Sequence, residues 1–330
     1  VVEMETAIGR HAKTNAIDAY GVINPKWKFV GAVNVICTLL IDMYYIIVSG
    51  YVLKYAVDFL VGSSFAPDSA TYYNTFISDP IQPLIYAGIL MTITVVLLSF
   101  GITELVEKVT KVIMPLLFIL LVVCGIWALI KIDGAIDGLK FYLIPNFKTM
   151  AEIGIVDVIV AAMNQAFFTL SLGMGCMAIF GSYVKKDRSL MGESINVAVL
   201  DTFVAFTSGL IIFPACFAYG VEADNGPSLI FKTLPNIFNN IPLGRLWGSL
   251  FFVFMSFAAL STIITVFETL ISCTMDLFGW SRKKACIVNC IALLVLSMPC
   301  ILGFSVWSGF KPFGEGSNLM DLEDFAVNNI

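Results

Sequence analysis

Charge is scarce in this sequence. Only 13% of its 330 residues are Asp, Glu, Lys or Arg, while 58% are apolar; a soluble domain has about 25% charged and about 45–50% apolar residues. One histidine in the whole chain disfavours acid–base enzymology, and a net charge of −5 without a basic run disfavours nucleic-acid binding. We therefore predict a protein whose main partner is the lipid bilayer and which is neither an enzyme nor a nucleic-acid binder.

Disulfides, thiolate metal sites and organic cofactors are also not expected. The eight cysteines lie in or beside apolar segments, where reduced core cysteines are common. Cys286 and Cys290 share a helical face but have no third or fourth ligand nearby. The run from Gly173 to Ala178 matches a loose dinucleotide fingerprint, but no strand precedes it.

Long apolar runs dominate what is present. A helix needs about 20 apolar residues to cross a bilayer, because its backbone amides must be satisfied internally. Residues 1–9 resemble the tail of an earlier span and 321–330 the lead into a later one, so we expect truncation at both ends. Seven segments are long enough to span, at about 29–61, 83–103, 105–131, 157–184, 194–222, 246–276 and 285–306.

The basic residues predict the orientation, because Lys and Arg bias loops toward the cytoplasm. If successive spans cross the membrane in opposite directions, seven basic residues fall at scattered positions on one side of the membrane (Lys54, Lys131, Lys140, Lys148, Lys232, Arg245, Lys311). The other side, which we predict to be cytoplasmic, holds twelve at helix ends: Arg10, Lys13, Lys26, Lys28, Lys108, Lys111, Lys185, Lys186, Arg188, Arg282, Lys283 and Lys284.

The segment from Asn164 to Gly175 is too polar and glycine-rich for a smooth helix in an uncharged span. Each glycine costs roughly 1 kcal/mol in a helix interior, and an unpaired carbonyl in lipid costs several more. A broken helix lining a binding site would explain both features. A kinked helix with glycines for close packing is the alternative, and these residues alone do not decide between them.

Three carboxylates and two hydroxyls lie within apolar spans. An ionised carboxylate at a helix centre costs about 2.5–3.5 kcal/mol, so Asp201 needs a cation or a proton. Asp42 and Glu268 pose the same question, and for them a structural role is equally open. Ser261 and Thr262 could supply oxygen ligands to an alkali cation, although such hydroxyls often bond only to their own helix.

Several motifs together resemble the neurotransmitter:sodium symporter family, most closely its bacterial amino-acid transporters. They are the helix end Glu3–Arg10, Tyr44-Tyr45, Glu107-Lys108 with Met114-Pro115, the run Gln165–Gly175, Gly226–Phe238 and Ser261-Thr262. The run Gln-Ala-Phe-Phe-Thr-Leu-Ser-Leu-Gly is the most specific. The resemblance implies sodium-coupled amino-acid symport by alternating access.

By this resemblance the fold is an all-α polytopic, leucine-transporter-like membrane fold with inverted repeats, truncated at both ends. Residues 1–131 would hold the end of the second span and the third to fifth spans. Residues 132–156 would form an extracellular loop. Residues 157–330 would hold the second repeat, which comprises the sixth to ninth spans of the fold and the start of the tenth. The first span, which carries part of the site in the family, would be absent.

The resemblance also implies roles for individual residues. Thr169 and Asp201 would serve one sodium ion, and Ala258, Ser261 and Thr262 a second. Asp276, with Tyr183 nearby, would belong to a cytoplasmic gate. The substrate would be contacted by Ile41, Tyr45, Phe168, Thr169, Ser171, Met174 and Val266.

Two aspartates depart from the family pattern. The commoner residue at Asp201 is asparagine, and a fixed carboxylate there could replace the chloride that other members bind; this predicts chloride-independent transport. Asp42 replaces a usually apolar residue and receives no role. The apolar side chains of the expected site suggest an apolar or aromatic amino acid. A proton-coupled amino-acid permease and a non-transporting relative remain alternatives, and the oligomeric state is not predicted.

Overall fold

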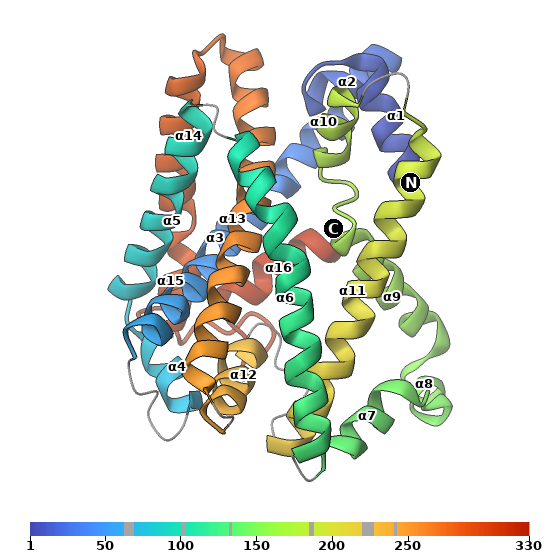
Figure 1. The fold of residues 1–330 in the computed structure, drawn as a ribbon. Coiled ribbons are helices and arrows are strands. Elements are labelled where there is room, and N and C mark those ends of the chain that lie inside the picture. The colour runs from blue at the N-terminus through green and yellow to red at the C-terminus, as the bar shows by residue number, and fades with distance from the viewer. Residues whose placement is uncertain are drawn as a thin grey trace.

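The computed structural model describes residues 1–62, 69–100, 103–131, 134–184, 188–219, 228–240 and 243–329, and these form helices without strands. Of the predicted basic cluster, Lys185 and Lys186 lie outside these residues. Figure 1 shows a bundle of long helices with shorter ones at both ends. The long helices are α3 (Lys28–Val61), α5 (Ile81–Phe100), α6 (Thr103–Lys131), α9 (Ile155–Thr169), α11 (Leu190–Tyr219), α13 (Gly244–Phe278) and α14 (Arg282–Leu296).

Shorter helices connect and cover the long ones. They are α1 (Val2–Ala12), α2 (Ala16–Ile23), the 3-10 turn η1 (Pro25–Trp27), α4 (Ser69–Ser78), α7 (Ala135–Leu143), α8 (Phe147–Ile153), α10 (Cys176–Tyr183), α12 (Ser228–Asn240), α15 (Met298–Phe304) and α16 (Leu319–Asn329). Helices also lie in the connections between the long helices: α4 follows α3, α7 and α8 follow α6, and α12 follows α11.

Two of the helices are much longer than a bilayer requires. The helix α3 has 34 residues and α13 has 35, and they pack along each other at the centre of the bundle. Each is followed by a glycine in the left-handed conformation, Gly62 with φ 82° and Gly279 with φ 64°. Because a left-handed residue ends the helical hydrogen-bond ladder, these glycines explain where the two helices stop.

Within the described residues, five helices are long and apolar enough to cross a membrane. They correspond to the predicted spans at 29–61, 83–103, 194–222, 246–276 and 285–306. The predicted span 105–131 is the helix α6, and the predicted span 157–184 is divided between α9 and α10. The helices α8 and α9 meet at 96°, and counting this bent pair as one span gives a sixth.

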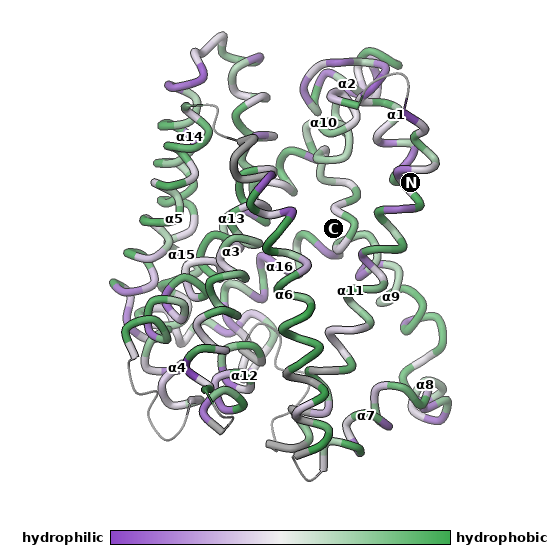
Figure 2. The backbone as a smooth tube through the Cα atoms, in the orientation of Figure 1, coloured by the Kyte–Doolittle hydropathy of each residue, from purple (hydrophilic) through white to green (hydrophobic). Residues whose placement is uncertain are grey.

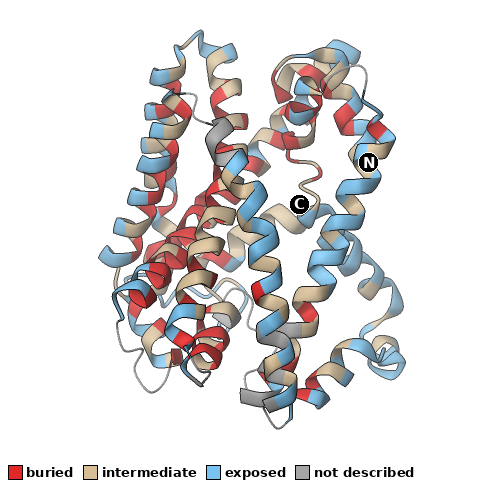
Figure 3. Cartoon of the chain, viewed as in Figure 1, coloured by how far each residue is buried: buried red, intermediate tan, exposed pale blue. Residues whose placement is uncertain are grey.

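The buried core and the apolar surface occupy different helices. Figure 3 shows buried residues concentrated in α3, α5 and α13, whereas α9 and α11 are mostly exposed. No residue of α9 is buried, yet this helix carries exposed Ile159, Val160 and Met163. Figure 2 shows that hydrophobic colour follows the long helices and that hydrophilic colour gathers toward the ends of the bundle. Such exposed apolar sides are expected where lipid, rather than water, surrounds a helix.

The helices α1, α2 and α10 lie together at one end of the bundle (Figure 1). Gly9 of α1 lies against the backbone of Ala178 in α10, and Gly181 of α10 lies against the backbone of Thr6. A side chain at either glycine would collide with backbone, so both glycines permit this close packing. At the same end, the Arg10 guanidinium donates to the carbonyl of Arg188 over 2.9 Å.

Candidate functional site

The break between α9 and α10 is the least regular part of the core. Ser171 has φ 53°, Gly173 φ 77° and Gly175 φ 74°. Left-handed conformations at alternate residues cannot continue a right-handed helix, and the serine carries a strain that glycine does not. The helix is therefore broken from Leu170 to Gly175, as the first of the two sequence interpretations requires.

Side chains from two other helices satisfy the backbone freed by the break. The Gly173 amide donates to Oε1 of Glu5 in α1 over 2.8 Å. The Thr38 hydroxyl of α3 donates to the Met174 carbonyl. Asn34 lies one turn earlier on α3. When its amide is assigned so that donors meet acceptors, its nitrogen donates to the Gly173 carbonyl over 2.9 Å and its oxygen accepts from the Tyr20 hydroxyl over 3.1 Å.

Sequence reasoning did not assign Glu5, Asn34 and Thr38 to the site. A partial signal was present, because Asn34 and Thr38 are polar side chains in the apolar helix α3 and all three residues are buried. A buried polar group needs a partner, but the partner here is backbone some 140–170 residues away in sequence, in a segment that is not helical. The partner could not be identified without the tertiary structure.

The first group of predicted ion ligands comes together across α9 and α11. The Thr169 hydroxyl, on the last residue of α9, donates to Oδ1 of Asp201 over 3.0 Å. Asp201 is half-buried near the middle of α11. The pair joins a carboxylate and a hydroxyl at the point where α9 ends, and oxygen ligands of this kind suit a hard cation.

The second group lies within α13. The hydroxyls of Ser261 and Thr262 both donate to the Ala258 carbonyl, over 2.7 and 3.3 Å. Three oxygens therefore converge on one side of the helix. The hydroxyls retain lone pairs that can accept a cation, so the arrangement is compatible with an alkali ion as well as with local bonding to the helix backbone.

Five of the predicted substrate residues belong to the apolar core that runs through the bundle. Ile41, Met174 and Val266 are buried in it, and Tyr45 and Phe168 pack against it. The Tyr45 hydroxyl lies close to the hydroxyls of Thr262 and Ser49. This tyrosine thus lies beside the oxygen group on α13. Of the remaining two predicted residues, Thr169 contacts Asp201 and Ser171 lies in the break.

The predicted gate residues have different neighbours. Asp276, at the end of α13, accepts from the Asn15 amide over 2.7 Å. Asn15 also donates to Asp18, and hydrogen bonds from Lys28 and Asn15 hold the pKa of Asp18 below its ordinary value. Tyr183 is 67% exposed and lies near the ion pair of Glu268 with Arg282.

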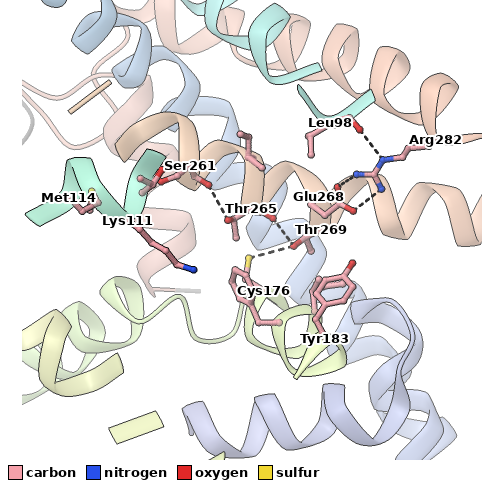
Figure 4. A pocket seen from close by; sticks show the side chains of 14 residues that line it. Leu98, Lys111, Met114, Cys176, Tyr183, Ser261, Thr265, Glu268, Thr269 and Arg282 are labelled. Carbon is pink, nitrogen blue, oxygen red and sulfur yellow. Dashed lines mark hydrogen bonds and ion pairs between the residues drawn. The ribbon is translucent and has the colours of Figure 1, made fainter. Parts of the chain in front are cut away.

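A cavity of about 670 Å³ opens between α5, α6, α10, α13 and α14. Figure 4 shows Ser261, Thr265, Glu268 and Thr269 of α13 lining one side of it and Cys176 and Tyr183 of α10 lining another. The Arg282 guanidinium makes two hydrogen bonds to Glu268, over 2.9 and 2.6 Å, and donates to the Leu98 carbonyl over 3.1 Å. This cavity has the size of a small-molecule site and carries hydroxyls along an apolar wall.

Comparison with known proteins identifies the family. Residues 81–318 match the sequence profile of the Sodium:neurotransmitter symporter family. The uncharacterized sodium-dependent transporter YhdH of Bacillus subtilis is 31% identical over 331 residues, which cover 99% of this chain and 72% of that protein. The chain belongs to the Sodium:neurotransmitter symporter family.

Other members are similar over the same length. An uncharacterized sodium-dependent transporter of Haemophilus influenzae is 29% identical, and the match covers this whole chain and 74% of that protein. The crystal structure of MhsT in complex with L-phenylalanine superposes with a TM-score of 0.92 at 35% identity, covering 99% of this chain and 74% of that one. The prediction of a leucine-transporter-like membrane fold in this symporter family is confirmed.

Proposed function

We propose that this chain mediates sodium-coupled symport of an apolar or aromatic amino acid by alternating access, without a requirement for chloride. The observation that carries the proposal is the Thr169–Asp201 pair at the end of the broken helix, where a hydroxyl and a carboxylate lie 3.0 Å apart. A carboxylate within an apolar helix is stabilised by a bound cation. Membership of a family of sodium-dependent transporters makes sodium the cation to test first.

The apolar character of the predicted substrate residues supports the proposed substrate. Ile41, Phe168, Met174 and Val266 would contact an apolar or aromatic side chain, while the Tyr45 hydroxyl would bind the substrate carboxylate. The similar structure MhsT was solved with L-phenylalanine, an aromatic amino acid. Under the same proposal, Ala258, Ser261 and Thr262 form the second sodium site, and Asp276 with Tyr183 forms part of a cytoplasmic gate.

The proposed arrangement is a plasma-membrane protein with its basic loops in the cytoplasm. The contact of Arg10 with Arg188 brings two of the basic clusters to one end of the bundle, as this orientation requires. The similar lengths of α3 and α13 support two inverted repeats, 1–131 and 157–330, separated by the helical loop 132–156.

Uptake by proteoliposomes tests the proposal. We expect accumulation of an apolar or aromatic amino acid with external sodium and none with potassium; unchanged uptake without sodium would instead indicate proton coupling. Replacing chloride with gluconate should leave uptake unchanged, and a collapse would refute the proposed chloride independence. Asp201→Asn should reduce the apparent sodium affinity at least tenfold, whereas Asp157→Asn, on the exposed start of α9, should leave it unchanged.

A further inference from the structure

Asp42 is the most isolated carboxyl group described in the core. Its side chain lies on α3 and is 0% exposed. Neither Oδ1 nor Oδ2 has a hydrogen-bond partner. An ionised carboxylate cannot remain in such a place without a compensating charge, because the cost of desolvation far exceeds that of neutralising the group.

Another buried carboxylate of the same helix has its negative charge compensated by neighbouring groups. Asp58 is also buried, but the Lys54 ammonium lies 2.5 Å from each of its oxygens and the Tyr72 hydroxyl donates to it over 2.6 Å. Asp58 therefore has a cation and a full set of donors. Asp42 has neither, although the two side chains lie on one helix and are buried to a similar degree.

The titratable groups that face Asp42 do not supply a positive charge. They are the Tyr45 hydroxyl on α3 and the Cys176 thiol, which begins α10; Cys176 also lies within reach of Glu5 from α1. None of the ion pairs found among the described residues involves Asp42. On α13, the acidic Glu268 is already paired with Arg282 of α14.

The surroundings of Asp42 determine which cation its carboxylate can bind. A metal ion takes several oxygen ligands, whereas no hydroxyl group of the described residues lies within hydrogen-bond distance of either Asp42 oxygen to share one. An amino or guanidinium group of a substrate would need an opening, and the zero exposure of Asp42 shows that none reaches it. A proton needs neither ligands nor space.

We propose that Asp42 is a proton-binding site, occupied in the conformation seen here and emptied when the wall beside it opens. The wall is the contact of Cys176 with Thr269, whose sulfur and hydroxyl oxygen lie 3.7 Å apart. Both residues line the 670 Å³ cavity, and Figure 4 shows their contact. Asp42 lies on the part of α3 that packs beside the start of α10, because Thr38, one turn before Asp42, donates to the carbonyl of Met174, two residues before Cys176.

The release step follows from this geometry. Cys176 is the first residue after the break, so a movement of α10 relative to α13 separates Cys176 from Thr269 and admits water. The O–H bond of the Asp42 carboxyl then breaks, its electron pair stays on the carboxylate, and the proton passes to water as hydronium. Before the wall closes, the carboxylate takes a proton from hydronium in the cavity, which re-forms the O–H bond and leaves water. Asp42 thus exchanges its proton with the cavity each time the broken helix moves.

Infrared spectroscopy of the purified chain tests the site without requiring transport. At pH 7 we expect a carboxylic-acid C=O band that is lost in Asp42→Asn and retained in Asp58→Asn, the matched control. Glu5→Gln identifies any second band, because one oxygen of Glu5 also lacks a partner. Asparagine has the shape of the protonated acid, so Asp42→Asn should unfold at the wild-type temperature. A spectrum unchanged by Asp42→Asn would overturn the proposal.

The wall is tested by exchange into heavy water. Cys176→Ala removes the sulfur, so the downshift of the Asp42 band in heavy water should be at least tenfold faster than in the wild type. Ser182→Ala, later on α10, serves as the control and should leave the rate unchanged. An equal rate in Cys176→Ala and wild type would contradict the assignment of Cys176 and Thr269 as the barrier.

The coupling to transport rests on the proposed function and has its own readout. In proteoliposomes, amino-acid uptake by the wild type should depend on pH, because Asp42 must lose and regain its proton as the wall opens and closes, and uptake by Asp42→Asn should not. A pH dependence retained in Asp42→Asn would overturn the coupling. Absence of any uptake by the wild type would refute the proposed function while leaving the infrared result to decide the proton site.

Discussion

At the scale of single residues, the site depends on short polar contacts between helices that are otherwise apolar. Thr169 and Asp201 connect α9 to α11, Thr38 connects α3 to the break, and Asn15 connects α2 to the end of α13. Each contact joins residues far apart in sequence. Substitutions that remove one hydroxyl or amide at constant shape therefore test one inter-helix contact at a time.

Thr169→Val should weaken sodium binding without unfolding the protein. Valine keeps the shape but removes the hydroxyl, which would leave Asp201 without its donor and the proposed ion without one ligand. Loss of a hydrogen bond to a charged group costs about 1.5–3 kcal/mol, so the apparent sodium affinity should fall about tenfold or more. Sodium-dependent thermal stabilisation measures this. Thr207→Val, whose hydroxyl bonds only to the Phe203 carbonyl of the same helix, should retain wild-type affinity.

Asn15→Ala should make the stability of the fold vary less with pH in the acid range. Because hydrogen bonds from Lys28 and Asn15 lower the pKa of Asp18, they stabilise the fold above the ordinary pKa of aspartate, and this contribution is lost as pH falls through the lowered value. The substitution of Asn15 therefore lowers the stability of the fold more at pH 7 than at acid pH. The effect is small, since Asp18 is exposed and solvent screens it. Thermal unfolding of both proteins across this pH range measures the difference, and parallel curves would contradict the assignment.

At the scale of elements, the broken helix is fixed by its glycines and by its neighbours together. Gly173 and Gly175 adopt left-handed conformations that favour glycine, and Glu5, Asn34 and Thr38 bond to the freed backbone. The first property is visible in the sequence as two glycines in an apolar span. The second is not, because it depends on α1 and α3 passing beside the break. A kinked helix therefore remained an equal alternative until the partners were placed.

Gly175→Ala should destabilise the protein more than alanine at other glycines. It combines the strain of φ 74° with a collision against the Ala16 side chain, and a left-handed non-glycine residue alone costs about 1–2 kcal/mol. Gly279→Ala isolates the strain, since φ is 64° but no atom lies nearby, and Gly309→Ala has neither cost. The unfolding temperature in detergent should fall most for Gly175→Ala, less for Gly279→Ala and least for Gly309→Ala. An equal loss for Gly175→Ala and Gly309→Ala would show that the break tolerates a side chain.

At the scale of the whole molecule, the bundle divides into a buried part and an exposed part. The helices α3, α5 and α13 form the core, and α14 is attached to them at the cavity by Arg282, which bonds to Glu268 of α13 and to the Leu98 carbonyl of α5. A single guanidinium thus connects three helices at one edge of the cavity. Any movement that widens the cavity at this edge has to break these bonds.

Glu268→Gln should destabilise the bundle and widen this edge of the cavity. It leaves the half-buried Arg282 charge without its partner, at a cost of about 1–3 kcal/mol, and the double variant with Arg282→Gln should recover part of the loss. Asp137→Asn is the matched control, because its ion pair with Lys140 is exposed and such pairs contribute about 0–1 kcal/mol. Thermal unfolding is measured for the wild type, the two single variants, the double variant and Asp137→Asn, and strict additivity of the two single changes would exclude coupling between Glu268 and Arg282.

The sequence by itself determined the helical membrane class, the approximate limits of the long helices and the residue types of the site. Composition, span length and isolated polar residues are local properties, and the lipid environment makes each costly to violate. Only the tertiary structure decided that Thr169 contacts Asp201, that Glu5 and Thr38 hold the break, and that Asp42 has no partner while Asp58 has two. These facts depend on which helix faces which, and packing between segments distant along the chain sets that arrangement.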